Sequence, residues 1–157
     1  MNPAARLRSR GLVLVAVLAL TALGAGCGSN QTTPSAQVTE VVHGFLSEQV
    51  DGSPSDACDF LTGPARVELV AFVAKAARAR EPKTCADALG LAHDRASKTL
   101  LDALRTADIT DIHVNGSKAT VMVRAGAAFK PQEVSLKRSF GNMTRPWKID
   151  GAPHLGG

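Results

Sequence analysis

The 157-residue chain contains no tyrosine, only one tryptophan and only three cysteines. It also lacks a phosphate-cradling glycine loop, a GxSxG elbow, an HExxH pair, an EF-hand loop and zinc-finger spacing. No local motif therefore indicates a catalytic residue, a metal site or a cofactor, and we predict none of the three. Hydrophobic residues at 45% and charged residues at 20% are ordinary for a globular protein, which excludes bulk disorder.

Positive charge is scarcer than the net charge of +4 suggests. Arg6, Arg8 and Arg10 lie in a segment that we expect to be removed, and without these three of the 18 basic residues, 15 remain against 14 acidic ones. With so few aromatic rings to stack on bases, this balance argues against a nucleic-acid partner. The C-terminal third is mildly basic, which is typical of the solvated face of a sheet. Its basic residues include Lys130, Lys137, Arg138, Arg145 and Lys148.

The N-terminus has the pattern of an export signal over residues 1–26. Three arginines precede an apolar run from Gly11 to Leu23. An uncleaved membrane anchor is the alternative, but a transmembrane helix needs about 20 apolar residues. The run is shorter and ends in glycines, which form helices poorly.

The segment Leu23-Gly24-Ala25-Gly26-Cys27 resembles the lipobox of bacterial lipoproteins. It departs from the lipobox at Gly24, where leucine is favoured. The resemblance implies cleavage before Cys27 and a diacylglyceryl group on its thiol. The chain is then expected on the extracytoplasmic face of the cell membrane, held by its lipid anchor.

The cysteine count agrees with this expectation. If Cys27 carries lipid, Cys58 and Cys85 remain as a pair in an oxidising compartment, where disulfides persist. We predict a disulfide between them, with two buried reduced thiols as the alternative. A zinc site is less favoured, because two cysteines 27 positions apart lack the close spacing that supplies four ligands.

We predict one folded domain over residues 38–151. Cys27 and the uncharged segment up to residue 37 form a flexible tether, and residues 152–157 form a tail. The first helix is expected over residues 37–50. Its apolar positions follow helical spacing: Val38, Val41, Val42, Phe45 and Leu46.

Further helices are expected up to about Thr106. A short helix is expected from Pro54 to Leu61. Another is expected to begin at Gly63-Pro64 and to end before Glu81-Pro82. Its apolar positions are Leu69, Val70, Val73, Ala76 and Ala77. Thr84 caps the last with Asp87 three residues later, and a break is expected near His93.

From Asp108 the hydrophobic period changes to two, which predicts strands. Asn115-Gly116 is typical of a type I′ hairpin turn. The alternating apolar residues are Ile112 and Val114, then Ala119, Val121 and Val123, then Val134, Leu136 and Phe140, and finally Trp147 and Ile149. The sequence therefore predicts an α+β fold, with N-terminal helices packed on a curved antiparallel sheet of three to four strands.

Besides the lipidation signal and the Asn115-Gly116 hairpin, the chain has three further short motifs: Ala57-Cys58-Asp59-Phe60-Leu61-Thr62, Thr84-Cys85 and Pro146-Trp147-Lys148-Ile149-Asp150-Gly151. Together these motifs resemble a group of small actinobacterial envelope lipoproteins with a nuclear-transport-factor-2-like, cystatin-like fold. The resemblance implies a cone of helices over a bent sheet, usually enclosing a hollow, and a place in the cell envelope.

These observations predict a non-enzymatic binding or interaction module, with a small apolar ligand or an envelope protein as its partner. The alternative is an accessory subunit of an envelope complex without a small-molecule ligand. An isomerase or dehydratase of the cone fold is less expected, because the chain has no tyrosine to stabilise an enolate. Asp111 and His113 flank Ile112 and would point away from the core, which leaves His93 as the only inward candidate base.

Overall fold

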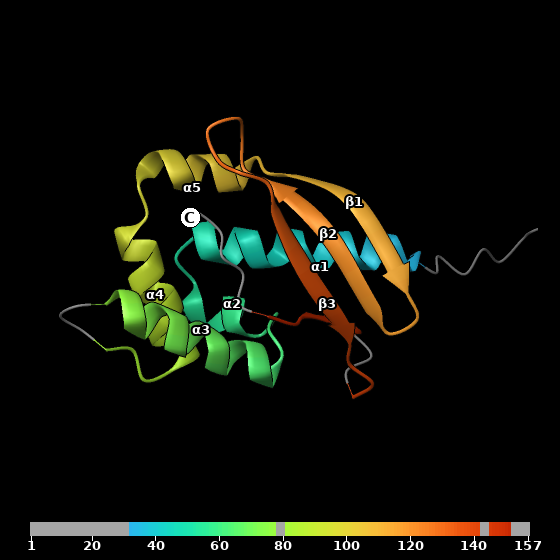
Figure 1. Cartoon of the computed structure of the whole chain (residues 1–157), viewed down its shortest axis with the longest axis horizontal. Helices are drawn as coiled ribbons and strands as arrows, with labels where there is room; N and C mark the ends of the chain where they lie inside the picture. Colours follow the sequence, from blue (N-terminus) through green and yellow to red (C-terminus); the bar gives the residue numbers. More distant parts are fainter. Residues whose placement is uncertain (1–31, 78–80, 142–144, 152–157) are drawn as a thin grey trace, which may run out of the picture. The chain divides into compact units, whose positions relative to one another are not determined.

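The computed structural model describes residues 32–77, 81–141 and 145–151, and in them five helices precede a four-stranded antiparallel sheet (Figure 1). This confirms the predicted α+β class. The helices are α1 (Pro34–Val50), α2 (Pro54–Cys58), α3 (Gly63–Ala76), α4 (Cys85–Arg95) and α5 (Lys98–Arg105). The strands are β1 (Asp108–Asn115), β2 (Lys118–Arg124), β3 (Gln132–Arg138) and β4 (Trp147–Ile149).

Helix α1 begins three residues earlier than the sequence predicted. The hydroxyl of Thr33 accepts a hydrogen bond from the amide of Ala36 at 3.2 Å, and Pro34 occupies the first helical position. Residues 34–37 are therefore helical, and their assignment to a flexible tether was wrong. The predicted apolar stripe from Val38 to Leu46 is confirmed, since all five of its side chains are buried.

Helix α2 ends at Cys58 rather than Leu61, because the following residues pair with the sheet. The amide of Thr62 donates to the oxygen of Ile149 at 2.9 Å, and the amide of Ile149 donates to the oxygen of Phe60 at 2.8 Å. Leu61 thus forms a parallel bridge with Ile149. This short extended segment covers the outer edge of β4.

The start of α4 is as predicted, but its end is not. Thr84 and Asp87 form the expected capping box, with each side chain bound to the other's amide at 3.1 and 3.0 Å. The break near His93 was placed too early, since α4 continues to Arg95. Ser97 then caps α5 by accepting from the amide of Leu100 at 3.1 Å.

The sheet is a meander in the order β1-β2-β3-β4, and two details differ from prediction. Asn115 pairs with Lys118, so the hairpin loop is Gly116-Ser117. Only Gly116 of the loop has a positive φ, +59°, which is typical of a type II′ turn rather than the predicted type I′. Phe140 was also misassigned to a strand, because β3 ends at Arg138 and the Phe140 side chain is 87% exposed.

Strand β1 forms the other edge of the sheet and carries a bulge. The register shifts between Thr110 and His113, and Asp111 adopts a φ of +50°. The extra residue resets the alternation, so that Ile109 and Ile112 are both half-buried despite their odd spacing.

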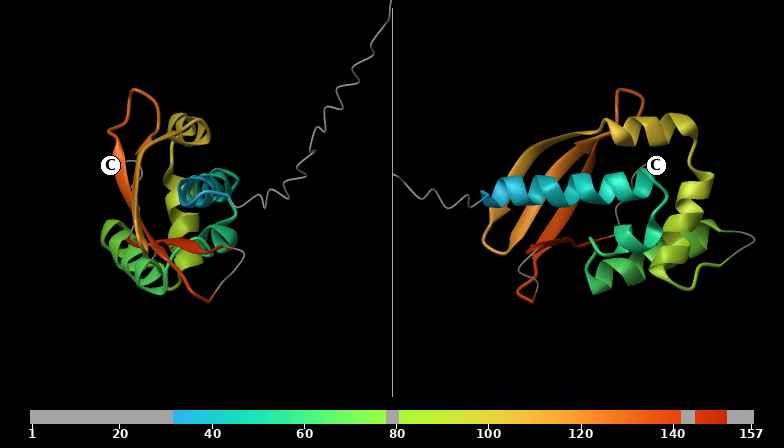
Figure 2. Two further views of the ribbon diagram at one scale, coloured as in Figure 1. Left: turned by 90° about the vertical axis from the view of Figure 1, so that its right-hand side faces the viewer. Right: turned by 180° about the vertical axis from the view of Figure 1, so that it is seen from behind.

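Helix α1 crosses one face of the sheet and contacts both β1 and β4 (Figure 2). All buried hydrophobic side chains of the described chain lie between Val38 and Ile149. The described residues from Thr32 onward form one compact unit that contains this core, so we expect residues 32–157 to fold without the first 31 residues. No helix among the described residues has the length and apolar character needed to cross a membrane.

Candidate functional site

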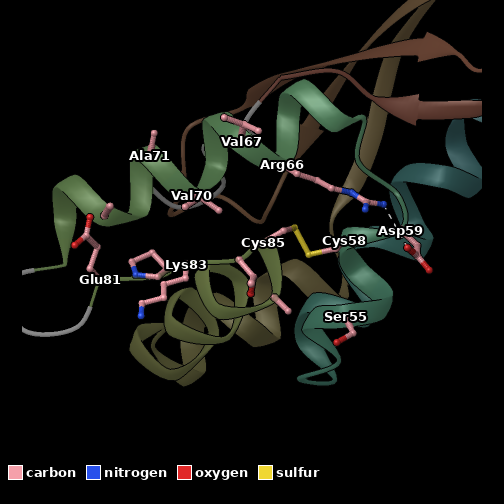
Figure 3. A pocket seen from close by; sticks show the side chains of 14 residues that line it. Ser55, Cys58, Asp59, Arg66, Val67, Val70, Ala71, Glu81, Lys83 and Cys85 are labelled. Atoms are coloured by element: carbon pink, nitrogen blue, oxygen red, sulfur yellow. Dashed lines mark hydrogen bonds and ion pairs between the residues drawn. A yellow bond between two sulfur atoms is a disulfide. The ribbon is translucent and has the colours of Figure 1, made fainter.

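A groove of about 710 Å³ lies between α3 and the segment from Glu81 to Ala86 (Figure 3). Helix α3 forms one wall, and the chain leading into α4 forms the other. The disulfide between Cys58 and Cys85 lies between these walls and joins the end of α2 to the start of α4.

The wall formed by α3 is apolar because this helix has apolar residues on two sides. Leu69 and Val73 are buried in the core, whereas a second stripe at positions i, i+3, i+4 and i+7 lines the groove. That stripe consists of Val67, Val70, Ala71 and Ala74. Val67 is 71% exposed, which is unusual for a valine on a well-packed helix. Val70 packs against the core, as predicted, and also lines the groove, whereas Ala76, which was predicted to join the core stripe, is exposed.

The opposite wall is held in place by hydrogen bonds from backbone amides to the side chain of Asp87. One oxygen of the Asp87 carboxylate accepts from the amides of both Lys83 and Thr84, at 3.2 and 3.0 Å. Pro82 is buried beside them. The groove is thus bounded by two preformed surfaces, as is usual for a ligand site.

The predicted pairing of Cys58 with Cys85 is confirmed, with Cα atoms 6.1 Å apart. Cys58 is buried, and Cys85, the first residue of α4, is half-buried. The disulfide replaces the alternatives of two reduced thiols or a zinc site, because its sulfur atoms are bonded to each other.

Charged side chains lie at both ends of the groove. At one end, Arg66 Nη2 lies 3.3 Å from Asp59 Oδ1, and Glu81 and Lys83 lie at the other. The Asp59 side chain is 66% exposed, so this ion pair contributes little to stability. An apolar floor with charged ends suits an amphipathic molecule.

The other sequence-predicted residues lie outside the groove. Cys27 falls outside the described residues. Asp111 and His113 are exposed and point away from the core, as predicted, and His93 is half-buried against the end of α1. Within the described ranges, no group of three or more His, Cys, Asp or Glu residues could hold a metal ion.

Sequence reasoning missed the groove, although a signal for it was present. Val67, Val70, Ala71 and Ala74 have helical spacing, but the predicted stripe joined Val70 to the core positions Leu69 and Val73 and left the other three out. Comparison of the chain with models of protein families, with curated proteins and with solved structures finds no match.

Proposed function

We propose that the protein is a lipid-anchored lipoprotein of the extracytoplasmic membrane face that acts as a non-enzymatic binding module. The groove beside α3 is its ligand site, and the ligand is a small amphipathic molecule with an apolar body. The observation that carries this proposal is the apolar stripe of α3, in which Val67 and Ala71 are exposed and Val70 and Ala74 are half-buried, because a contiguous apolar patch on the surface of a folded domain marks an interaction site.

The groove is suited to binding rather than to acid–base chemistry. Its described lining contains no histidine, and its two cysteines are joined as a disulfide. Of its carboxylates, Asp59 already accepts a hydrogen bond from Arg66. The remaining contacts would be apolar, with Ser55 and Thr84 as hydroxyl partners.

The anchor is supported by the sequence and by the start of α1. The export-signal pattern leads directly to Cys27, and Pro34 begins the folded domain seven residues later. A fully extended chain covers about 3.5 Å per residue, so the tether reaches no further than about 25 Å. A lipid on Cys27 would therefore keep the domain close to the membrane.

Mass spectrometry of the chain isolated from its own membrane tests the anchor. We expect a chain that begins at Cys27 and carries the mass of a diacylglyceryl group. We expect the variant Cys27→Ser to be absent from the membrane fraction. A chain that begins at Met1, or an unmodified Cys27, would contradict the anchor.

Native mass spectrometry of residues 32–157, exported behind a cleavable signal peptide and isolated from a homologous envelope, tests the ligand site. We expect an extra mass that disappears on denaturation. Val67→Glu places a charge in the apolar stripe and should abolish the extra mass. Phe140→Glu is the matched control, because this exposed apolar side chain lies outside the groove.

Two outcomes would contradict the ligand proposal. Equal loss of the extra mass in both variants would show that the groove is not the site. A bare domain would instead favour the accessory-subunit alternative, which crosslinking in the membrane can follow. The likeness to the cone-fold lipoproteins remains a prediction.

A further inference from the structure

Three lysines stand side by side on the sheet. Lys118 of β2 is the register partner of Lys137 of β3, and Lys137 is in turn the partner of Lys148 of β4. Their neighbours Ala119, Leu136 and Ile149 are buried, so the lysines occupy the other face, away from the core. Like charges directly opposite one another destabilise a sheet. This arrangement therefore lowers the stability of the sheet unless an anion binds to the three lysines.

The row leads into a hollow of about 420 Å³ at the start of α3. Lys137 and Lys148 line this hollow together with Arg138 and Arg66, so four cationic side chains from three elements converge there. Gly63, the first residue of α3, has no heavy atom within 4 Å of the position a Cβ would take. The positive end of the 14-residue helix therefore adds to the charge of the hollow.

Few carboxylates compensate this charge. Asp59 pairs with Arg66 at 3.3 Å, and Asp150 accepts a hydrogen bond from the hydroxyl of Thr62 at 2.9 Å. In the described part of the chain, no ion pair joins Lys118, Lys137 or Arg138 to an acid.

The pKa of the Lys148 ammonium group is lowered by these surroundings. Burial is the main cause that lowers its pKa, and the nearby positive charges of Arg66 and Arg145 lower it further, while Asp59 opposes them. Its Nζ also donates to the backbone oxygen of Asp59. A bound anion would relieve the repulsion that these cations exert on one another.

The lysine row lies near the end of the sheet where α1 begins. The start of α1 and the hairpin between β1 and β2 lie at the same end of the sheet (Figures 1 and 2). Lys118 directly follows that hairpin, and Lys137 lies near the end of β3. Cys27 precedes Pro34, the first residue of α1, by only seven positions, so a domain anchored through Cys27 would hold the row within reach of lipid headgroups.

We propose that the row Lys118–Lys137–Lys148 and the adjoining hollow bind the phosphate groups of anionic phospholipids. The nearness of the membrane rests on the proposed anchor, whereas the charge of the site does not. The site recognises phosphate oxygens through several ammonium and guanidinium groups, and the positive end of α3 adds to their attraction.

Flotation of residues 32–157 with lipid vesicles tests the site without the anchor. We expect binding to vesicles that contain phosphatidylglycerol, no binding to phosphatidylcholine vesicles, and weaker binding as salt is added. Each lysine near an anionic surface changes the affinity about fivefold, so the double variant K118Q/K137Q should bind about 25-fold more weakly. The charge-matched control is K75Q/K130Q, since neither residue lies in the row or the hollow. Circular dichroism checks that all variants fold.

Three results would overturn the proposal. One is the absence of binding to phosphatidylglycerol vesicles at low salt, and another is an equal loss in K75Q/K130Q. The third is calorimetric binding of inorganic pyrophosphate without vesicle binding, which would assign the site to a soluble phosphate instead. None of these results depends on Cys27, so a failure here is distinguishable from a failure of the anchor.

Discussion

The Nδ1 atom of His93 lies 2.8 Å from the backbone oxygen of Gln49. A carbonyl oxygen only accepts, so the imidazole donates to the last turn of α1. A second bond runs the opposite way, because the side-chain amide of Gln49 donates to the oxygen of Leu89 at 3.3 Å. His93, the only inward candidate base, thus helps to hold α4 against α1.

Replacing His93 should therefore affect stability. We expect His93→Ala to lower the free energy of unfolding by about 1–2 kcal/mol, because it leaves a half-buried carbonyl without its donor. Urea unfolding measures this change. His43→Ala is the control, since this exposed histidine on α1 should change stability by less than about 0.5 kcal/mol. Equal effects would contradict the structural role of His93.

The disulfide should account for a large part of the stability. It closes a loop across 27 positions, so the variant Cys58→Ala with Cys85→Ala should lose about 2–4 kcal/mol of unfolding free energy. Reduction of the unaltered domain should give a similar loss when measured in the same denaturant. If either treatment leaves the unfolding midpoint unchanged, the two cysteines are not bonded in the protein.

Gly44 marks a close approach between α1 and the ring of Phe60. A Cβ at Gly44 would lie 2.6 Å from two ring atoms, and the ring is buried beneath the guanidinium of Arg145. Alanine normally favours a helix by about 1 kcal/mol over glycine, but here we expect a net loss of about 1–3 kcal/mol. Gly63→Ala is the control, because open space surrounds that position.

A second variant tests the cause of the Gly44 effect. Phe60→Leu shortens the ring that the new methyl group would meet. The loss caused by Gly44→Ala should therefore be smaller in the Phe60→Leu background. A loss of the same size in both backgrounds would show that the ring is not the obstacle.

The conformation of the hairpin predicts different effects on stability for substitutions at two neighbouring residues. Asn115 is a strand residue paired with Lys118, so Asn115→Thr should be neutral or slightly stabilising. Gly116 has a φ of +59°, so Gly116→Ala should cost about 1–2 kcal/mol. Thermal unfolding compares the two variants. A type I′ turn would instead penalise threonine at 115 as well, which would restore the sequence-based expectation.

The sequence predicted features that depend on local spacing or on counting. The stripe of α1 and the capping box of Thr84 with Asp87 are local patterns, and both are confirmed. The pairing of Cys58 with Cys85 followed from the number of cysteines. His113 is exposed as expected, because alternation from Ile112 to Val114 needs no knowledge of distant contacts, whereas Asp111 is exposed as part of a bulge that was not predicted.

The features that were missed depend on contacts between distant segments. Helix α2 ends earlier than predicted because Leu61 pairs with Ile149, 88 positions later. No local pattern reveals this pairing. The lysine row depends on the registers of β2, β3 and β4, and a shift of one residue would remove it. The groove depends on which side of α3 the chain leading into α4 covers.

Neither edge of the sheet offers a flat strand to another molecule. Residues 60–62 occupy the edge at β4, and at the other edge the bulge at Asp111 and the charged side chains of β1 interrupt the ladder. Molecules confined to a membrane plane collide far more often than the same molecules in solution. If Cys27 carries lipid, this arrangement would keep crowded neighbours from joining their sheets into aggregates.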